Sequence, residues 1–403
     1  MKTRLIAIVL LILPNLALAE ARQVDKYHWE GVERIVAVGD IHGDYGNYIA
    51  TLQAAGVVDR KEKWSGGETH LVQVGDLPDR GPDTLKIIEH IRGLTKQARK
   101  KGGRVHSLIG NHEMMNVVGD LRYVIPAEFE AFAGRKSKAM RDRYYELYIQ
   151  RLEEVDPEAF AKLPADYREQ WNAEHPLGWL EHRQAWDPAW NREAEIAKWV
   201  MEQEVAIRVN DSLFVHGGIS AYYCANTLAS LTERAVEEMN AYDPAVDGIL
   251  YDPNGPLWYR GLAGYEPRAV PETVDAILGS HGVSRVVVGH SPTQGVVWPE
   301  YGGKVLVIDT GISGHYGGYV AYLEITPEGT FAGYPDGKLP LPTGEDDVIP
   351  YLEKVISMDP GNKYLQRRLQ KLTQPPAVEN GEAAAEPAEG ETAPPAIPIC
   401  GTS

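Results

Sequence analysis

The sequence predicts a layered α/β domain with a helical insertion. Several short apolar runs end at a glycine that lies beside Asp, Asn or His, which is typical of strands bounded by sharp turns. Helical candidates lie between the early strands, and alternating strands and helices favour a sheet covered by helices. Residues 114–205 carry no clear strand signal before Val205 and are rich in helix formers. These three observations define the expected architecture.

Five predicted strands end at polar residues with metal-binding or proton-transfer chemistry. They cover residues 34–38, 70–74, 105–109, 213–215 and 285–288. Glycine beside such a residue permits a sharp turn and a close backbone approach. Two later strands are expected at 304–308 and 319–325. Helices are expected at 48–55 and 82–99, and Pro82 suits the first turn of the second one.

The segment 114–205 is predicted to be a set of short helices, because Asp-Pro, Leu-Pro and His-Pro pairs punctuate it. It contains five of the nine tryptophans: Trp171, Trp179, Trp186, Trp190 and Trp199. They form either the core of the insertion or part of a substrate pocket. Two further helices are expected within 346–372, after a catalytic domain that spans 20–345. Residues 373–403 have the Pro, Ala, Glu and Gly composition of a disordered tail.

Composition limits the partners and the compartment. The chain has 403 residues, 43% of them hydrophobic, and a formal charge of -17, which argues against a nucleic-acid partner. Residues 1–19 have a basic start, a short apolar run and an Ala-Leu-Ala cleavage site, so we expect a secretory signal peptide and a periplasmic or secreted protein. No stable membrane insertion is expected after cleavage. The two cysteines, Cys224 and Cys400, allow one bridge, but the tail position of Cys400 argues against it.

The polar residues at the strand ends suit a pair of divalent metal ions. Carboxylate, imidazole and amide oxygen are ligands for such ions, and six of them are too many for one site with open positions. Asp76 is the natural bridge, because two-metal sites share ligands across about 3.5–4 Å. The predicted ligands are Asp40, His42 and Asp76 for one ion, and Asp76, Asn111, His216 and His290 for the other. Manganese is the expected ion, with iron or zinc as alternatives.

The remaining candidate residues match the needs of phosphate ester hydrolysis. Arg80 and Arg260 supply forked cationic donors for phosphate oxygens, and Asn111 is expected to contact the substrate as well. A water held between the ions has a lowered pKa and is expected to attack phosphorus. His112 stands beside Asn111 and can protonate the leaving group, while Asp79 can orient that imidazole.

These motifs together resemble the metal-dependent phosphoprotein phosphatases within the calcineurin-like metallophosphoesterases. The motifs that carry the resemblance are Gly-Asp-Ile-His-Gly at 39–43, Gly-Asp-Leu-Pro-Asp-Arg-Gly at 75–81, Gly-Asn-His-Glu at 110–113, His-Gly-Gly at 216–218 and Gly-His at 289–290. The resemblance implies a central β-sandwich of mixed sheets flanked by helices, two metals, and hydrolysis of phosphomonoesters.

Within this family the chain is most similar to the bacterial Shewanella-like phosphatases. His175-Pro176, Glu181-His182-Arg183, Trp258-Tyr259-Arg260 and the segment 309–313 carry that similarity. Two departures stand out. Residues 309–314 replace the Ser-Ala-Pro-Asn-Tyr segment of the eukaryotic enzymes, so binding of their regulatory subunits is not implied. The last motif lacks the second His of Gly-His-x-His, and His315 is expected to line the pocket at most.

The sequence therefore predicts a periplasmic or secreted phosphatase acting on phosphoproteins or small phosphomonoesters. Phosphotyrosine and phosphoserine or phosphothreonine are not distinguished, and neither is the oligomeric state. A dinucleotide polyphosphate hydrolase is the first alternative, although a secreted protein does not meet such cytosolic substrates. An inactive metal-binding interaction protein is the second, and the complete ligand set with both arginines argues against it.

Overall fold

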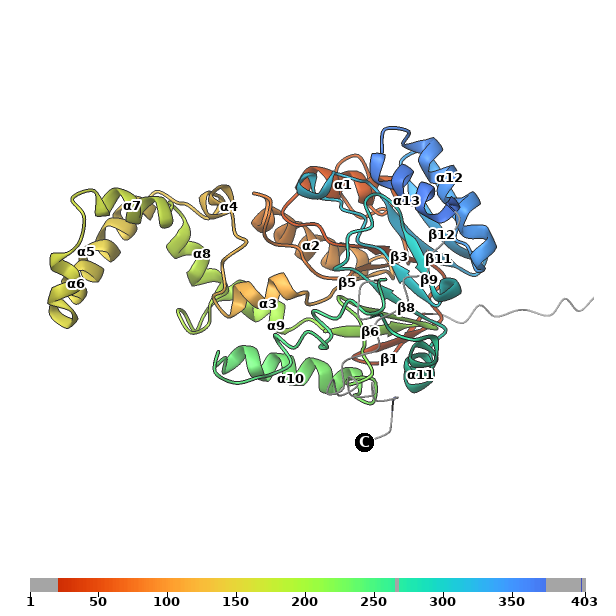
Figure 1. The fold of residues 1–403 in the computed structure, drawn as a ribbon, viewed down its shortest axis with the longest axis horizontal. Coiled ribbons are helices and arrows are strands. Elements are labelled where there is room, and N and C mark those ends of the chain that lie inside the picture. Colours follow the sequence, from red (N-terminus) through yellow and green to blue (C-terminus); the bar gives the residue numbers. More distant parts are fainter. Residues whose placement is uncertain (1–20, 265–267, 375–399, 401–403) are drawn as a thin grey trace, which may run out of the picture.

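The computed structural model describes residues 21–264, 268–374 and 400, so the predicted signal peptide and most of the predicted tail lie outside the described residues. Within these residues the strands form two mixed sheets (Figure 1). In pairing order, the first sheet contains β1 (Arg22–Asp25), β2 (His28–Glu30), β6 (Ala206–Val209), β7 (Ser212–Val215), β8 (Arg285–Val288), β10 (Val305–Val307) and β9 (Trp298–Glu300). The second contains β13 (Gly337–Pro340), β12 (Gly329–Tyr334), β11 (Tyr322–Thr326), β3 (Ile35–Val38), β4 (His70–Gln73) and β5 (Arg104–Ser107). The predicted α/β class with mixed sheets is confirmed.

Each sheet contributes three neighbouring parallel strands, and their register aligns their carboxyl ends. In the second sheet β3, β4 and β5 are parallel, with Val38 opposite Gln73 and Gln73 opposite Ser107. In the first sheet β7, β8 and β10 are parallel, with Val288 opposite both Val215 and Val307. Strands β3, β4, β7 and β10 are buried along their whole length, as expected for parallel strands covered on both faces.

Helices flank the two sheets, and several begin at recognisable caps. The described helices are α1 (Tyr45–Ala54), α2 (Thr84–Arg99), α3 (Asn111–Val117), α4 (Pro126–Ala131), α5 (Ser137–Val155), α6 (Pro157–Ala161), α7 (Tyr167–Glu174), α8 (Trp179–Trp186), α9 (Glu195–Met201), α10 (Leu228–Asn240), α11 (Pro271–His281), α12 (Val348–Met358) and α13 (Lys363–Thr373). Asp44 caps α1 by accepting the backbone N–H of Asn47 at 2.9 Å. Pro82 lies just before the N-cap of α2, Asp83, and not inside its first turn.

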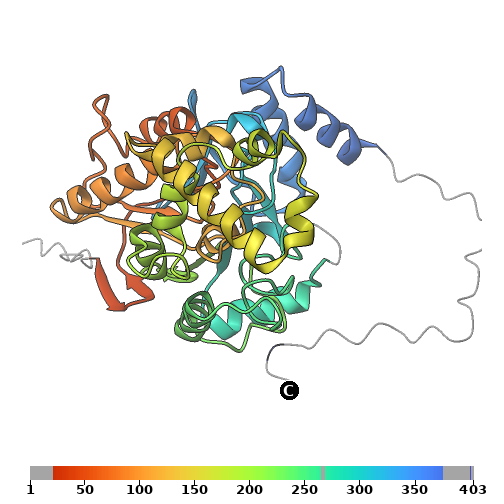
Figure 2. The same cartoon turned by 90° about the vertical axis from the view of Figure 1, so that its left-hand side faces the viewer.

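Helices α4 to α8 project from the body that holds the two sheets (Figure 1), and they lie in front of it in the turned view (Figure 2). Phe129, Trp179 and Leu180 form a small apolar cluster of their own in this insertion. Trp171 and Trp186 are also buried. None of the five insertion tryptophans lines the cavity at the strand ends. Trp179 packs in the insertion cluster, Trp186 belongs to the main core and Trp190 is exposed. In the described part of the chain, no helix combines the length and apolarity needed to cross a membrane.

The expectation that Cys400 stays unbridged is wrong, because a disulfide joins Cys224 to Cys400 across 176 positions of sequence. Cys224 is buried between the end of β7 and α10, and the Cα atoms of the pair lie 5.6 Å apart. Composition describes the average folding tendency of a segment and carries no information about the contact of one side chain. The bridge therefore ties the extreme C-terminus to the catalytic body.

We expect the unreduced, denatured protein to show no thiol that reacts with a disulfide-exchange reagent. Reduction should expose two thiols, because the described structure contains no free cysteine. Thiol titration before and after reduction checks this result. The Cys400→Ser variant is the control and should show one reactive thiol without reduction. Two thiols in the unreduced wild-type protein would contradict the bridge.

Candidate active site

Glycine pairs allow the loops after the parallel strands to meet. A Cβ atom on Gly43 would lie 2.4 Å from the carbonyl oxygen of Gly81, and one on Gly75 would lie 2.7 Å from the Cα atom of Gly110. Both Gly43 and Gly75 also have positive φ, which other residues adopt at a cost. Five site residues other than glycine share such left-handed backbone: His42, Asp76, Asp79, Arg80 and His290. Strained backbone of this kind is concentrated at functional sites.

Three predicted ligands of the second ion face one nitrogen of the fourth, His216. His216 Nε2 lies 2.9 Å from Asn111 Oδ1, 3.1 Å from His290 Nδ1 and 3.3 Å from Asp76 Oδ2. His216 Nδ1 lies 3.0 Å from the carbonyl oxygen of Val74, and a proton on Nδ1 would leave Nε2 as a lone-pair donor. Lone-pair atoms then face one another, and a shared cation would make this arrangement favourable.

The predicted ligands of the first ion lie at the same edge of the structure. His42 Nε2 is 3.9 Å from Asp40 Oδ2 and 3.8 Å from Asp76 Oδ2. His42 Nδ1 lies 3.1 Å from the carbonyl oxygen of Pro78, which orients the ring and leaves Nε2 facing the carboxylates. One group of candidate ligand atoms that all lie within 4.8 Å of one another contains His42, Asp76 and His112, and Asp40 is not part of it. Asp76 belongs to both groups.

The electrostatics of the buried ligands fit a cationic occupant. Burial raises the pKa of Asp40 well above its usual range, and the carboxylates of Asp309 and Asp76 raise it further. Burial lowers the pKa of His42 to about 3 and depresses that of His290, so both rings are neutral. Neutral imidazole is the form that binds metals, and crowded carboxylates need a cation to ionise together. His290 Nε2 is buried without a hydrogen-bond partner.

His112 and Asp79 form a buried pair beside these ligands. His112 Nδ1 lies 2.5 Å from Asp79 Oδ2, and Asn116 Nδ2 donates to Asp79 Oδ1 at 3.0 Å. Burial alone would lower the pKa of His112, but the carboxylates of Asp76 and Asp79 raise it above its usual value. His112 Nε2 faces the predicted metal ligands and lies 3.8 Å from Asp76 Oδ2.

A cavity of about 220 Å³ gathers the predicted residues and adds aromatic walls. Arg80 and Arg260 both line it, as do Tyr123, Trp258 and Tyr316. The Arg80 guanidinium lies 4.0 Å from the centre of the Tyr123 ring. Arg260 donates to the carbonyl oxygen of His290 at 2.5 Å and to Ser291 at 3.1 Å. His315 is exposed and does not line the cavity.

Sequence reasoning missed two acidic residues of this site. Asp309 follows β10 as the predicted ligands follow their strands, and it lines the cavity while only 2% exposed. Burial and Asp76 raise its pKa to about 7, although the backbone N–H of Gly311 opposes that shift. The apolar run before Asp309 and the nearby glycine are the same signal that identified the other strand ends. The sequence indicates no role for Glu113 beyond its place in the Gly-Asn-His-Glu motif.

Glu113 holds the loop that carries Asp76. Its two carboxylate oxygens accept the backbone N–H groups of Leu77 at 2.6 Å and of Asp76 and Gly110 at 2.9 Å. Burial and the charge of Asp76 raise the pKa of Glu113 to about 7. Only the folded chain shows this role, because it depends on contacts between residues more than thirty positions apart.

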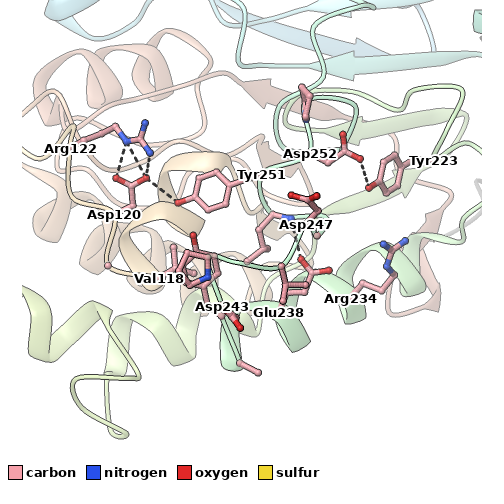
Figure 3. A pocket seen from close by; sticks show the side chains of 18 residues that line it. Val118, Asp120, Arg122, Tyr223, Arg234, Glu238, Asp243, Asp247, Tyr251 and Asp252 are labelled. Carbon is pink, nitrogen blue, oxygen red and sulfur yellow. Dashed lines mark hydrogen bonds and ion pairs between the residues drawn. The ribbon is translucent and has the colours of Figure 1, made fainter. Parts of the chain in front are cut away.

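A larger cavity of about 800 Å³ is lined by residues of α10 and of the loops around it (Figure 3). Tyr251 lines it, donates to Asp120 Oδ2 at 3.0 Å and stacks on Trp258, which lines the smaller cavity. Its charged lining consists of five carboxylates and two guanidinium groups, from Asp120, Glu238, Asp243, Asp247, Asp252, Arg122 and Arg234. The surface next to the strand-end site is therefore recessed and acidic.

Comparison with known proteins assigns the chain to a family. The family model described as calcineurin-like phosphoesterase matches residues 33–294, and the chain belongs to this family. It is therefore a metal-dependent phosphoesterase, and the His and Asp groups of its site are suited to divalent metal ions.

Its relatives include named phosphatases. The chain is 31% identical to Shewanella-like protein phosphatase 2 of Arabidopsis thaliana, over 72% of this chain and 74% of the relative. It is 32% identical to an uncharacterised protein of Schizosaccharomyces pombe, over 73% and 78% of the two chains. The crystal structure of a cold-active protein-tyrosine phosphatase from a psychrophilic Shewanella species has 27% identity and a TM-score of 0.60, over 79% of this chain and 83% of that one. The predicted resemblance to the Shewanella-like phosphatases is confirmed, and these relatives support phosphatase activity.

Proposed function

We propose that this protein is a dinuclear-metal phosphomonoester hydrolase acting on phosphoproteins, with phosphotyrosine as the preferred residue. The observation that carries the proposal is that Asp76 belongs to both groups of candidate ligands, with Arg80, Arg260 and His112 lining the same cavity. Two ions in this site would polarise the phosphoryl group and lower the pKa of a water. Manganese is the proposed ion, with iron or zinc as alternatives.

The residues of the chain have distinct proposed roles. Arg80 and Arg260 bind the phosphoryl oxygens and, with Asn111, set the phosphorus in line for attack by water. The bond to the leaving oxygen breaks as His112 Nε2 delivers its proton to that oxygen. Asp79 holds Nδ1 of the imidazole and stabilises the protonated ring.

Aromatic walls support an aryl phosphate as substrate. Tyr123, Trp258 and Tyr316 surround the cavity, and an aromatic ring packs favourably against such side chains. The Shewanella neighbour is titled a protein-tyrosine phosphatase. The adjoining recessed surface leaves room for residues that flank a phosphorylated side chain. A peptide substrate thus suits the molecule better than a small phosphomonoester alone.

A panel of phosphopeptides tests the substrate class. The mature protein loaded with Mn²⁺ should hydrolyse phosphotyrosine peptides with higher kcat/KM than matched phosphoserine and phosphothreonine peptides. The reverse order would assign the serine and threonine class. Hydrolysis of dinucleotide polyphosphates in preference to every peptide would establish the alternative hydrolase, and absence of any turnover would leave a metal-binding protein. Elemental analysis should find two metal ions per chain.

Arg80→Lys is expected to lower kcat/KM for 4-nitrophenyl phosphate by ~10–100-fold. A charged hydrogen bond contributes about 1.5–3 kcal/mol, and lysine cannot reproduce the forked geometry. Steady-state kinetics and inhibition by inorganic phosphate measure the effect. Arg122→Lys is the matched control, since Arg122 is exposed and pairs with Asp120. Unchanged phosphate affinity in Arg80→Lys would exclude Arg80 from the phosphate site.

We also propose a periplasmic or secreted location, and no nucleic-acid partner because the formal charge is -17. The Cys224–Cys400 disulfide supports an oxidising compartment. The secreted form should begin near Glu20, and the intact mass of protein recovered from periplasm or medium checks this. Recovery of the full-length chain from the cytoplasm alone would contradict it.

A further inference from the structure

The turn that carries Asp79 and Arg80 has an unusual backbone. Both residues have left-handed φ, 71° for Asp79 and 67° for Arg80. Adjacent residues other than glycine rarely adopt this conformation, so surrounding contacts must maintain it. Their side chains serve the acid His112 and the substrate cavity respectively. Whatever holds this turn therefore controls two proposed functions at once.

The start of the helical insertion holds the turn. The Arg80 backbone N–H donates to the carbonyl oxygen of Tyr123 at 3.3 Å, and that of Asp79 donates to Glu128 Oε1 at 3.4 Å. The Arg80 guanidinium also lies over the Tyr123 ring. Residues in the short stretch 123–128 thus accept hydrogen bonds from the backbone N–H groups of both left-handed residues.

Glu128 is an unusual residue for this position. It lies on α4 and is fully buried, and within the described residues it has no ion-pair partner. Its Oε2 atom is buried, and the hydroxyl of nearby Thr84 is the polar side-chain group that interacts with the carboxyl. Burial and the neighbouring Asp79 raise the pKa of Glu128 well above its usual range. A buried carboxyl group with few hydrogen bonds is costly, and an apolar side chain would fill the space more favourably.

We propose that Glu128 is a positioning residue for the general acid. It binds the backbone of Asp79 and so keeps the Asp79 carboxylate aligned with His112. The first helix of the insertion is then required for proton transfer to the leaving group. The inference rests on the proposed function, in which His112 is that acid.

Leaving-group dependence tests this role in the metal-loaded full chain. Glu128→Ala should lower kcat for phenyl phosphate, whose leaving group is poor, by ~10-fold or more. This loss is part of the ~10²–10⁴-fold that general acid catalysis contributes. The loss with 4-nitrophenyl phosphate, whose leaving group is good, should be smaller. Glu128→Gln should restore most of the rate, because its amide offers an uncharged acceptor of the same size. Equal losses on both substrates, or a glutamine variant as slow as the alanine variant, would overturn the proposal.

A double-mutant cycle separates positioning from general destabilisation. If Glu128 acts through His112, Glu128→Ala should cost little further rate with phenyl phosphate in a His112→Ala background. Additive losses would overturn the proposal. Glu324→Ala is the control for loss of a buried carboxylate, since Glu324 pairs with Arg34 and Lys338 and does not line the cavity. It should leave the ratio of the two rates unchanged.

Two further readouts keep the outcome unambiguous. Should Glu128→Ala fail to fold by circular dichroism, Glu128→Leu fills the same space without an acceptor and should show the same selective loss. Equal rates for Glu128→Leu and wild type on phenyl phosphate would overturn the proposal. If wild type hydrolyses neither aryl phosphate, the proposed function fails. If the wild type is active and Glu128→Ala has the same ratio of the phenyl phosphate rate to the 4-nitrophenyl phosphate rate as the wild type, only the proposed role of Glu128 fails.

Discussion

Replacing Asp76 by asparagine is expected to remove bound metal and to lower phosphatase activity by ~10³-fold or more, because several kcal/mol of transition-state stabilisation depend on the ions. Asp76 Oδ2 lies 3.3 Å from His216 Nε2 and 3.8 Å from His42 Nε2, so one oxygen faces both ligand groups. Asp76 Oδ1 accepts the backbone N–H of His112 at 3.0 Å. An amide lacks the charge that offsets two cations, and its NH₂ group cannot bind one.

Elemental analysis and calorimetric titration with Mn²⁺ measure the loss directly, independently of turnover. Asp211→Asn is a suitable control, because Asp211 precedes β7 at the end opposite His216 and pairs with Arg285 at the surface. The control should keep wild-type metal content and kcat. Wild-type metal content in Asp76→Asn would refute the bridging role, even if activity fell.

The His112→Ala variant is expected to keep its metal content and to lose ~10²–10⁴-fold in kcat with poor leaving groups, the usual contribution of a general acid. The loss should shrink as the leaving group improves, since a stable phenolate needs no proton. The physical basis is the buried pair of His112 Nδ1 and Asp79 Oδ2, which holds the ring with Nε2 toward the ligands. Asp79→Asn should cause an intermediate loss in the same direction.

A series of aryl phosphates with graded leaving groups, combined with metal analysis, distinguishes the two roles open to His112. His112 belongs to one of the two groups of candidate ligand atoms, so metal loss in His112→Ala would make it a ligand instead of an acid. His281→Ala provides the control, because His281 ends α11 and lines neither cavity. That variant should follow wild type along the whole series.

Much of the site could be predicted because the strand ends carry a local signal. An apolar, β-branched run followed by glycine and a polar residue identified the segments that deliver Asp40, Asp76, Asn111, His216 and His290. The register of β3, β4 and β5, and that of β7, β8 and β10, aligns these ends. The same signal precedes Asp309, which the predicted ligand set does not include.

Residues that act through a distant backbone contact carry no such signal. Pro78 matters through its carbonyl oxygen beside His42, and Glu113 through the backbone N–H groups of the Asp76 loop. Glu128 accepts the backbone N–H of Asp79, although the two residues are 49 positions apart in the sequence. The Cys224–Cys400 bridge was predicted to be absent because Cys400 lies in a segment with the composition of a disordered tail.

The sequence by itself determined the α/β class, the family resemblance and the residues able to bind metal and phosphate, because these follow from local hydrophobic patterns and from motifs at short spacing. The tertiary structure alone decided which donor atoms face His216 Nε2, which backbone groups hold the Asp79–Arg80 turn, and that the insertion supports this turn. Such relations depend on the packing of two sheets and an insertion against one another, and no short stretch of chain contains that information.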